Sequence, residues 1–198
     1  MKNKKFTIII TAYKRYNAIK TLLYSLLAQT YNNFDLIIIH DGFDRLHIDT
    51  MAEFLQYPNI MYFQTPIRYN NWGMSLRNIG ISLATGDFII NTNDDNYYTP
   101  NWLEELNSAI ESDQNINFVY YDMVLSHNNI ENHNKKDYGL FTPQLKHSYI
   151  DMGQFAVKRE IIKKYTFNLT APADGELVEE MLPELNAHYI DKILFVHN

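Results

Sequence analysis

Cysteine is absent from the 198 residues of the chain. Its absence excludes disulfide scaffolds, cysteine zinc sites, iron–sulfur clusters and thiol nucleophiles. A chain without cysteine also fits a reducing compartment, and we expect a cytoplasmic protein.

Long hydrophobic runs are also lacking. No segment approaches the roughly 18–20 continuous apolar residues that cross a bilayer. The apolar run Phe6–Ile10 is too short for the core of a signal peptide, and polar residues follow it at once. We therefore expect no transmembrane segment, which leaves peripheral membrane contact open.

Positive charge is scarce as well. There are 17 Lys and Arg residues against 23 Asp and Glu residues, which gives a formal net charge of −6. This balance argues against a general nucleic-acid binder, whose binding face is usually basic. The 46% of hydrophobic residues is enough for the buried core of one ordinary domain.

Short apolar runs alternate with helical periodicity through the first half of the chain. The predicted strands are 6–11, 34–40, 60–63 and 88–90, and the predicted helices are 18–29, 49–55 and 74–84. Gly86 is expected to end the third helix as its C′ residue. The alternation predicts an α/β fold with right-handed crossovers and a mainly parallel sheet.

The second half is less regular. Helical spacing predicts helices over 101–111, 158–164 and 175–182, and strands are expected at 118–124, 151–157 and 193–196. Residues 126–147 are polar and are interpreted as a long loop. Long loops of this kind are often functional.

Polar residues follow three of the first four predicted strands. Tyr13 follows the first strand, Asp41 the second, and Asp94 and Asp95 the fourth. Ligands of open parallel sheets bind outside the carboxyl ends of the strands. We therefore expect these side chains to converge on one crevice.

The run Asn93-Asp94-Asp95-Asn96 suits a hard divalent cation. Mg²⁺ and Mn²⁺ prefer oxygen ligands and are often completed by water and substrate phosphates. Adjacent side chains rarely reach one ion together, so one direct ligand is expected. An Asx-rich turn before the helix that follows Pro100 explains the same residues equally well.

Other polar residues have two interpretations each. Asp41 suits hydrogen bonds to a ribose or a base, but an Asp before Gly42 is also typical of a turn. Tyr13 suits stacking on a base, or is a half-buried surface aromatic. Arg68 and Arg77 suit phosphate oxygens, although surface arginines are more often simply solvated.

Several motifs together resemble family 2 glycosyltransferases. They are Thr11-Ala-Tyr13, Ala28-Gln-Thr30 with Phe34, His40-Asp41, Leu76-Arg-Asn-Ile-Gly-Ile81, Ala84-Thr-Gly-Asp-Phe88 and Asn93-Asp-Asp-Asn-Tyr-Tyr-Thr-Pro100. The resemblance covers the first half of the chain and continues more loosely through 150–159 and 173–176. It implies the GT-A fold and an inverting, nucleotide-sugar-dependent enzyme of polysaccharide biosynthesis, with UDP the expected nucleotide.

The resemblance also implies a division of labour within a single domain. Residues 1–98 would bind the nucleotide-sugar donor and residues 99–198 the acceptor, a glycan or another hydroxyl compound. Thr11 and Tyr13 match the start of the uridine pocket, with Tyr13 stacking on uracil. Asp41 matches the acid that contacts the base or ribose. This division is also compatible with a further domain, either fused to the chain or associated with it, that completes the acceptor site.

The same resemblance assigns the metal and phosphate contacts. Asp95 matches the acid that binds Mn²⁺ or Mg²⁺, and Asp94 the neighbour that contacts ribose or sugar. Asn93 stands where the family usually has the first acid. His197 matches a late His that meets the metal or the diphosphate.

Arg77 matches the Arg of the family's Ala-Arg-Asn segment. Arg68 is the alternative for this role, because it precedes a Tyr as in one member of the family.

The general base is assigned to Asp174, which matches a late acidic motif of the family. Glu176 is the alternative if the match is displaced by two residues. A structural role as N-cap of the helix over 175–182 would also explain Asp174.

Two other functions compete with this interpretation. A nucleotidyltransferase would need a glycine-rich loop after the first strand, and residues 11–17 contain no glycine. A non-catalytic nucleotide- or glycan-binding domain would account for Asn93. Nucleotide binding without turnover would separate it from an enzyme.

Overall fold

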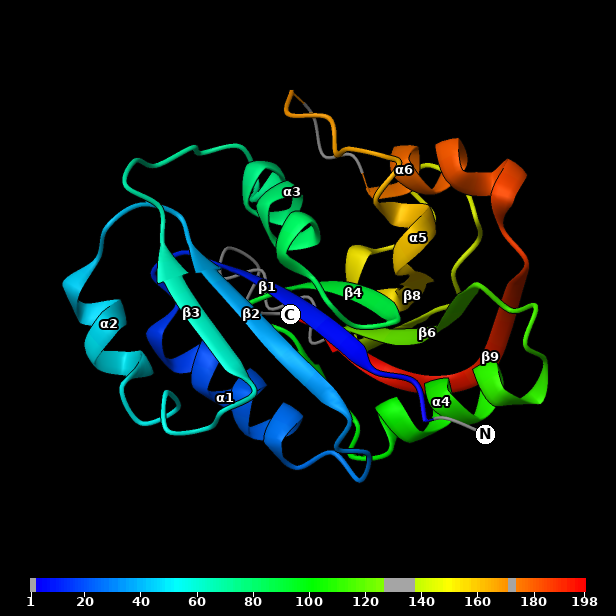
Figure 1. The fold of residues 1–198 in the computed structure, drawn as a ribbon, viewed down its shortest axis with the longest axis horizontal. Helices are drawn as coiled ribbons and strands as arrows, with labels where there is room; N and C mark the ends of the chain where they lie inside the picture. The colour runs from blue at the N-terminus through cyan, green and yellow to red at the C-terminus, as the bar shows by residue number, and fades with distance from the viewer. Residues whose placement is uncertain (1–2, 127–137, 171–173) are drawn as a thin grey trace.

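The computed structural model describes residues 3–126, 138–170 and 174–198. Helices lie on both faces of a mixed sheet in the order β3-β2-β1-β4-β8-β6-β9-β5, and β7 pairs with β6 (Figure 1). The α/β fold predicted from the sequence is confirmed. The sheet continues through both predicted halves of the chain, and their assignment to donor and acceptor remains a prediction.

The N-terminal part of the sheet is parallel. Its strands are β1 (Phe6–Ala12), β2 (Phe34–His40), β3 (Ile60–Gln64) and β4 (Phe88–Asn93). The connecting helices are α1 (Tyr16–Leu27), α2 (Arg45–Met51) and α3 (Met74–Leu83). Every residue of β1 is buried, because β1 lies between β2 and β4 and is covered on both faces.

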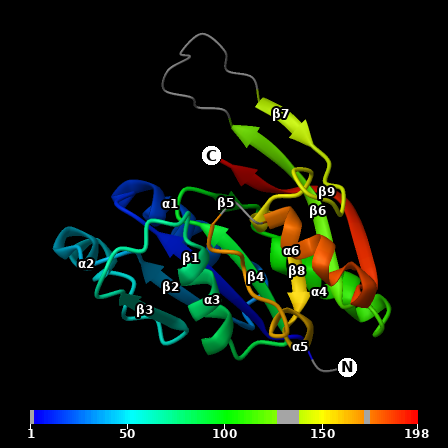
Figure 2. The ribbon, with the colours of Figure 1, turned by 90° about the horizontal axis from the view of Figure 1, so that it is seen from above.

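The remaining strands extend the sheet with mixed directions. They are β5 (Tyr97–Tyr98), β6 (Phe118–Ser126), β7 (Tyr138–Phe141), β8 (Phe155–Lys158) and β9 (Ala187–His197). β8 runs antiparallel to β4 and β6, whereas β9 runs parallel to β6. Figure 2 shows β7 beside β6 at one side of the molecule.

The second-half helices are α4 (Trp102–Ser112), α5 (Arg159–Ile162) and α6 (Asp174–Met181), with 3₁₀ turns η1 (Met152–Gln154) and η2 (Leu182–Glu184).

Two hydrophobic cores lie on opposite faces of the sheet. Ile8 and Ile10 of β1 contribute to a core with residues of α1, α2 and α4, and Ile9 contributes to a core with residues of α3, α5 and α6. This alternation follows from the two-residue side-chain period of a strand. Figure 1 shows the two groups of helices on either side of the sheet.

Strand β4 is longer than its apolar residues predicted. It continues through Asn91, Thr92 and Asn93, which pair with Ile9, Ile10 and Thr11 of β1. The predicted end of this strand at residue 90 was therefore wrong, because backbone pairing with β1 extends the strand to Asn93. This extension carries Asn93 to the same level as Thr11.

Other boundaries also differ. α2 begins four residues before the predicted helix, because the Asp44 carboxylate accepts a hydrogen bond from the His47 backbone N–H at 3.1 Å. β9 begins six residues early, η1 replaces the start of the strand expected at 151–157, and β7 lies within the expected loop 126–147. Residues 127–137 of that loop lie outside the described residues.

Gly86 has no left-handed conformation, so the prediction of a C′ glycine was wrong. A side chain at this position would place a Cβ 2.6 Å from the Thr7 backbone nitrogen, so Gly86 is required by close packing against β1.

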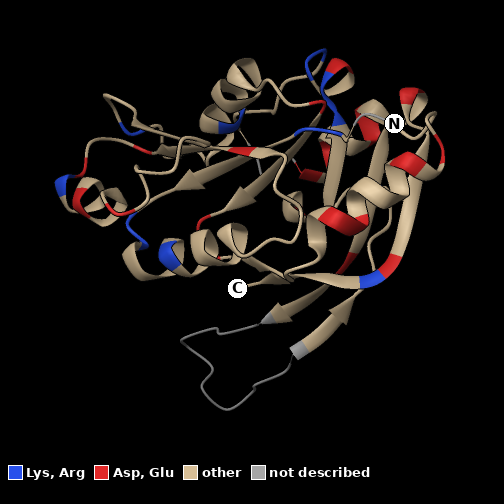
Figure 3. Cartoon of the chain, turned by 60° about the horizontal axis from the view of Figure 1, so that its bottom comes forward, with Lys and Arg blue, Asp and Glu red and all other residues tan. Residues whose placement is uncertain are grey.

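Among the described residues, no helix combines the length and apolarity of a membrane span. Figure 3 shows acidic and basic residues interspersed over the part of the chain that it colours.

Candidate active site

A cavity of about 710 Å³ opens where β1, β2 and β4 end. It is lined by all but one of the site residues predicted from the sequence, namely Thr11, Tyr13, Asp41, Arg68, Arg77, Asp94, Asp174 and His197. Asp95 and the alternative base Glu176 are not among the described residues that line it. The strand ends therefore converge on one crevice, and the roles of these residues remain predictions.

Tyr13 is partly covered by a cation. The guanidinium carbon of Arg68 lies 4.0 Å from the centroid of the Tyr13 ring, which is a cation–π contact. A nucleotide base that stacks on the Tyr13 ring would have to displace the Arg68 guanidinium or lie beside it. Arg68 and Tyr13 therefore belong to the same part of the cavity.

Asp41 fastens the loop between β3 and α3. Its Oδ1 accepts a hydrogen bond from the Tyr69 backbone N–H at 2.7 Å, and its Oδ2 accepts one from Asn70 at 2.9 Å. Both carboxylate oxygens keep further lone pairs for a ligand. The side chain can therefore both shape the loop and accept a hydrogen bond from a bound nucleotide.

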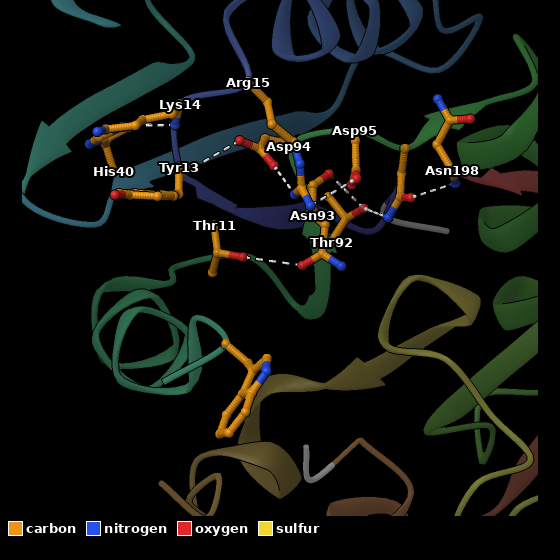
Figure 4. A network of polar contacts seen from close by, with 12 residues as sticks. Thr11, Tyr13, Lys14, Arg15, His40, Thr92, Asn93, Asp94, Asp95 and Asn198 are labelled. Carbon is orange, nitrogen blue, oxygen red and sulfur yellow. Dashed lines mark hydrogen bonds and ion pairs between the residues drawn. The ribbon is translucent and has the colours of Figure 1, made fainter. Parts of the chain in front are cut away.

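His40 joins the two loops that carry Tyr13 and Asp41. Its Nδ1 lies 2.8 Å from the carbonyl oxygen of Gly42. Its Nε2 accepts a hydrogen bond from the Lys14 backbone N–H at 3.2 Å (Figure 4). Since a carbonyl only accepts and an N–H only donates, this geometry requires a neutral ring with its proton on Nδ1. No such connecting role for His40 was predicted from the sequence.

Arg77 and Asn93 form a hydrogen-bonded pair in the wall of the cavity, where Arg77 is buried and Asn93 is half-buried. The Nη2 of Arg77 donates to Asn93 Oδ1 at 2.6 Å, and Nη1 donates to the Trp72 carbonyl at 2.6 Å. Thr11 donates to the same Asn93 oxygen at 3.3 Å. Burial lowers the pKa of Arg77, and the charges of Asp174, Asp151 and Asp94 oppose this shift. Asn93 therefore orients Arg77 through a neutral oxygen.

Arg15 bridges the two adjacent carboxylates. Its Nη1 lies 2.8 Å from Asp94 Oδ1 and its Nη2 lies 3.2 Å from Asp95 Oδ2 (Figure 4). Asp94 is fully buried and also accepts a hydrogen bond from the Tyr13 backbone N–H at 2.9 Å. Burial raises the pKa of Asp94, and its bonds to Arg15 and Tyr13 counter that effect.

The cavity is also lined by Asp151, Asp174 and His197. Asp174 is the first residue of α6, and burial together with the charge of Asp151 raises its pKa to about 6, against the opposing influence of Arg77. Asp151 caps η1 through a 2.7 Å bond from Gly153 N–H, and its Oδ2 lies 3.5 Å from His197 Nε2. A carboxyl with this pKa can accept a proton near neutral pH.

Sequence reasoning missed Arg15, Asp151 and Trp72, which also line the cavity. Arg15 lies two residues after Tyr13 in the loop that follows the first strand, and that position was its only local signal. Asp151 and Trp72 reach the cavity through contacts between distant segments, which no local pattern records.

The acidic residues of the site fit a divalent cation that takes only one or two of its ligands from the protein. Within the described ranges, no three His, Asp or Glu side chains gather closely enough to hold a metal ion by themselves. Mg²⁺ is often bound by one or two carboxylates, with substrate phosphates and water completing its shell. The Asp95 side chain keeps 18% of its surface exposed and can serve as such a carboxylate.

Residues 7–166 match the family model of glycosyl transferase family 2. The chain belongs to this family. This family 2 glycosyltransferase chain is 30% identical over 132 residues to the amylovoran biosynthesis glycosyltransferase AmsB of Erwinia amylovora. The alignment covers 63% of this chain and 42% of AmsB.

It is also 30% identical over 118 residues to the uncharacterized glycosyltransferase YwdF of Bacillus subtilis, covering 60% of this chain and 41% of YwdF. The chain thus spans about two fifths of the length of the curated relatives it matches.

The same fold occurs in solved structures of low sequence identity. The crystal structure of S. aureus TarS 1-349 in complex with UDP-GlcNAc has a TM-score of 0.81 at 16% identity, covering 98% of this chain and 58% of that one. The mannosyltransferase PcManGT from Pyrobaculum calidifontis, in complex with GDP-Man and Mn²⁺, has a TM-score of 0.74 at 15% identity, covering 100% and 57%. The GT-A fold expected of a family 2 glycosyltransferase is thereby confirmed.

Proposed function

We propose that this domain transfers a sugar from a nucleoside-diphosphate sugar, UDP-linked, to an acceptor hydroxyl with inversion at the anomeric carbon. The observation that carries the proposal is one cavity that is lined by Tyr13 and Asp41, which follow β1 and β2, and also by Asp174, the first residue of α6. The complexes of TarS with UDP-GlcNAc and of PcManGT with GDP-Man support a nucleotide-sugar donor. The likeness to AmsB supports a role in polysaccharide biosynthesis.

The donor end of the cavity would bind the nucleoside. Tyr13 offers an aromatic face, Arg68 a cation beside it, and Asp41 a carboxylate that accepts hydrogen bonds from a base or ribose. Thr11 and Asp94 would lie toward the ribose and the sugar. Arg77 supports this region with a buried positive charge.

Asp174 would act as the general base. It would accept the proton of the acceptor hydroxyl while the acceptor oxygen forms a bond to the anomeric carbon. The bond from that carbon to the diphosphate oxygen breaks in the same step, and its electron pair leaves with the nucleoside diphosphate. A single displacement inverts the carbon and needs no protein nucleophile.

Asp95 would hold a Mn²⁺ or Mg²⁺ ion, with His197 as a further candidate ligand. Such an ion, when bound, offsets the charge of the leaving diphosphate. The Mn²⁺ in the PcManGT complex supports this part of the proposal. Since this chain spans less than half of its curated relatives, a further glycan-binding segment or domain would complete the acceptor site.

The decisive experiment replaces the proposed base. Asp174→Asn should lower transfer about a hundredfold or more, as expected for a general base, while the affinity for UDP stays unchanged. Glu176→Gln is the matched control, since Glu176 lies in the same helix and is not among the cavity-lining residues. Donor hydrolysis with UDP-glucose, UDP-GlcNAc and GDP-mannose in Mn²⁺ gives the activity, and calorimetry gives the UDP affinity.

Unchanged turnover in Asp174→Asn would exclude Asp174 as the base. UDP binding without hydrolysis or transfer of any of these donors by the unaltered chain would instead favour a non-catalytic nucleotide-binding domain.

A further inference from the structure

Trp72 combines unusual exposure with a position in the cavity. Its side chain lines the cavity with 66% of the residue surface exposed, whereas the only other tryptophan, Trp102, is fully buried in the core. A large aromatic side chain that stays exposed inside a cavity points to a ligand that covers it.

The backbone at Trp72 is strained. Trp72 has a φ of 52°, and its neighbours Asn70 and Gly73 have φ values of 54° and 80°. For an aromatic residue this left-handed conformation costs free energy, so it persists only where other contacts enforce it. Strain of this kind concentrates at ligand-binding sites.

Two charged residues of the proposed site enforce this conformation. The Asp41 carboxylate accepts the backbone N–H groups of Tyr69 and Asn70, and Arg77 donates to the Trp72 carbonyl. A Cβ on Gly73 would lie 2.7 Å from Arg77 Nη1, so the backbone passes close to Arg77. The segment Tyr69–Gly73 is therefore fixed from both sides, with the indole left open to the cavity.

We propose that Trp72 is a stacking platform for a pyranose ring. The apolar C–H face of a sugar packs on an indole, and polar groups of the same cavity, such as Asn93 and Asp151, meet its hydroxyl edge. This inference rests on the proposed function, in which Tyr13 serves the base and leaves the second aromatic group for a sugar. The sugar comes either from the donor or from the end of the acceptor.

Fluorescence of Trp72 tests the platform directly, because the buried Trp102 is shielded from a water-soluble quencher. Acrylamide quenching is measured in two arms. The donor arm compares UDP-glucose, UDP-GlcNAc and GDP-mannose with UDP and GDP alone. The acceptor arm adds methyl glucoside, galactoside or mannoside, each at millimolar concentration, to the UDP complex. We expect a sugar in one arm to protect Trp72, and the nucleotides alone to leave its quenching unchanged.

Substitution then measures the contribution to binding. Trp72→Ala should weaken binding of the protecting sugar ligand about tenfold, the loss expected for one aromatic contact, and Trp72→Phe should restore part of it. The affinity for UDP and the melting temperature should stay unchanged. Tyr57→Ala is the control, since Tyr57 is also exposed but lies before β3, away from the cavity.

The inference is overturned if no sugar in either arm protects Trp72, or if nucleotide alone protects it fully, or if Trp72→Ala binds the sugar ligand as tightly as the unaltered chain. Failure of the proposed function has a different signature, because the chain would then bind neither UDP nor GDP, or would bind a nucleotide without hydrolysing or transferring any of the donors.

Discussion

Arg15 holds its guanidinium between Asp94 and Asp95, at 2.8 Å from one carboxylate and 3.2 Å from the other. The charge of Arg15 therefore lies where the sequence suggested that a divalent cation binds. Two cations cannot share this place without repulsion, so the position of Arg15 must govern how readily a metal binds.

Replacing Arg15 by Gln should raise the affinity for Mn²⁺ in the presence of UDP. Removing one positive charge a few ångströms away contributes about 1–3 kcal/mol at a partly solvated site, which corresponds to roughly tenfold or more in affinity. Titration calorimetry with Mn²⁺ measures this change. Arg15→Lys is the control, because it keeps the charge and should bind Mn²⁺ as the unaltered chain does. Weaker Mn²⁺ binding by Arg15→Gln than by Arg15→Lys would contradict the prediction.

The Arg15 contact also marks the limit of what the sequence could predict. The strands over 6–12 and 34–40 follow from local runs of apolar and β-branched residues, and their ends placed Tyr13 and Asp41 correctly in the cavity. Arg15 meets Asp94 across 79 residues of chain. Such a pairing depends on how the strands are ordered in the sheet, and neither residue's local sequence specifies it.

The same reasoning explains why the predicted end of β4 was wrong and why Trp72 was missed. Asn91, Thr92 and Asn93 have a loop-like composition, but their backbone groups pair with β1. The conformation of Trp72 is enforced by two residues from other elements. Asp41, which follows β2, accepts a hydrogen bond from the Asn70 N–H, and Arg77 of α3 donates one to the Trp72 carbonyl. Tertiary hydrogen bonds outweigh local preference in both places.

Activity should depend on pH through Asp174. Its pKa of about 6 means that the carboxylate form, which alone can accept a proton, grows as the pH rises through 6. We expect the transfer rate at saturating donor to rise about tenfold per pH unit below 6 and to level off above 7. A pH–rate profile between 4.5 and 8.5 checks this, and a flat profile over that range would contradict Asp174 as the base.

The stability of the fold should also depend on pH through Asp174, but it should fall as the pH rises, whereas the activity should increase. The folded pKa of about 6 exceeds the ordinary value of 3.8, so the folded chain favours the protonated form. The contribution of protonated Asp174 to the free energy of unfolding is complete below pH 3.8 and is lost as the pH rises through about 6. The shift corresponds to about 3 kcal/mol before screening by water in the cavity reduces it.

Asp174→Asn should therefore raise the melting temperature at pH 8 and change it little at pH 4. Thermal unfolding at both pH values measures the difference. Glu176→Gln is again the control, and an equal shift at both pH values would show that the ionisation of Asp174 is not the cause.

His40 should matter to both stability and nucleotide binding. Removing the ring leaves the Lys14 N–H and the Gly42 carbonyl without their partner. The loss costs about 1–3 kcal/mol for the buried Gly42 carbonyl. His40→Ala should lower the free energy of unfolding and weaken UDP binding, since the loops carrying Tyr13 and Asp41 lose their connection. His40→Gln should recover part of the UDP affinity by offering an acceptor to Lys14.

Denaturant unfolding and UDP titration test this prediction. His188→Ala is the control, because His188 is the second residue of β9 and is not among the residues that line the cavity. If His40→Ala loses stability but binds UDP normally while folded, His40 has only a structural role.

Gly175 should be needed for the placement of Asp174. A Cβ on Gly175 would lie 2.4 Å from the Cα atom of His147, so the start of α6 would have to move away from the backbone at His147. Overpacking of this kind costs about 1–3 kcal/mol. Gly175→Ala should therefore lower the melting temperature and also reduce transfer, because Asp174 moves with the helix start. Gly139→Ala is the matched control, since its Cβ would meet no atom within 4 Å. A Gly175→Ala variant that melts early but transfers sugar at the normal rate when folded would show that catalysis does not depend on this position of Asp174.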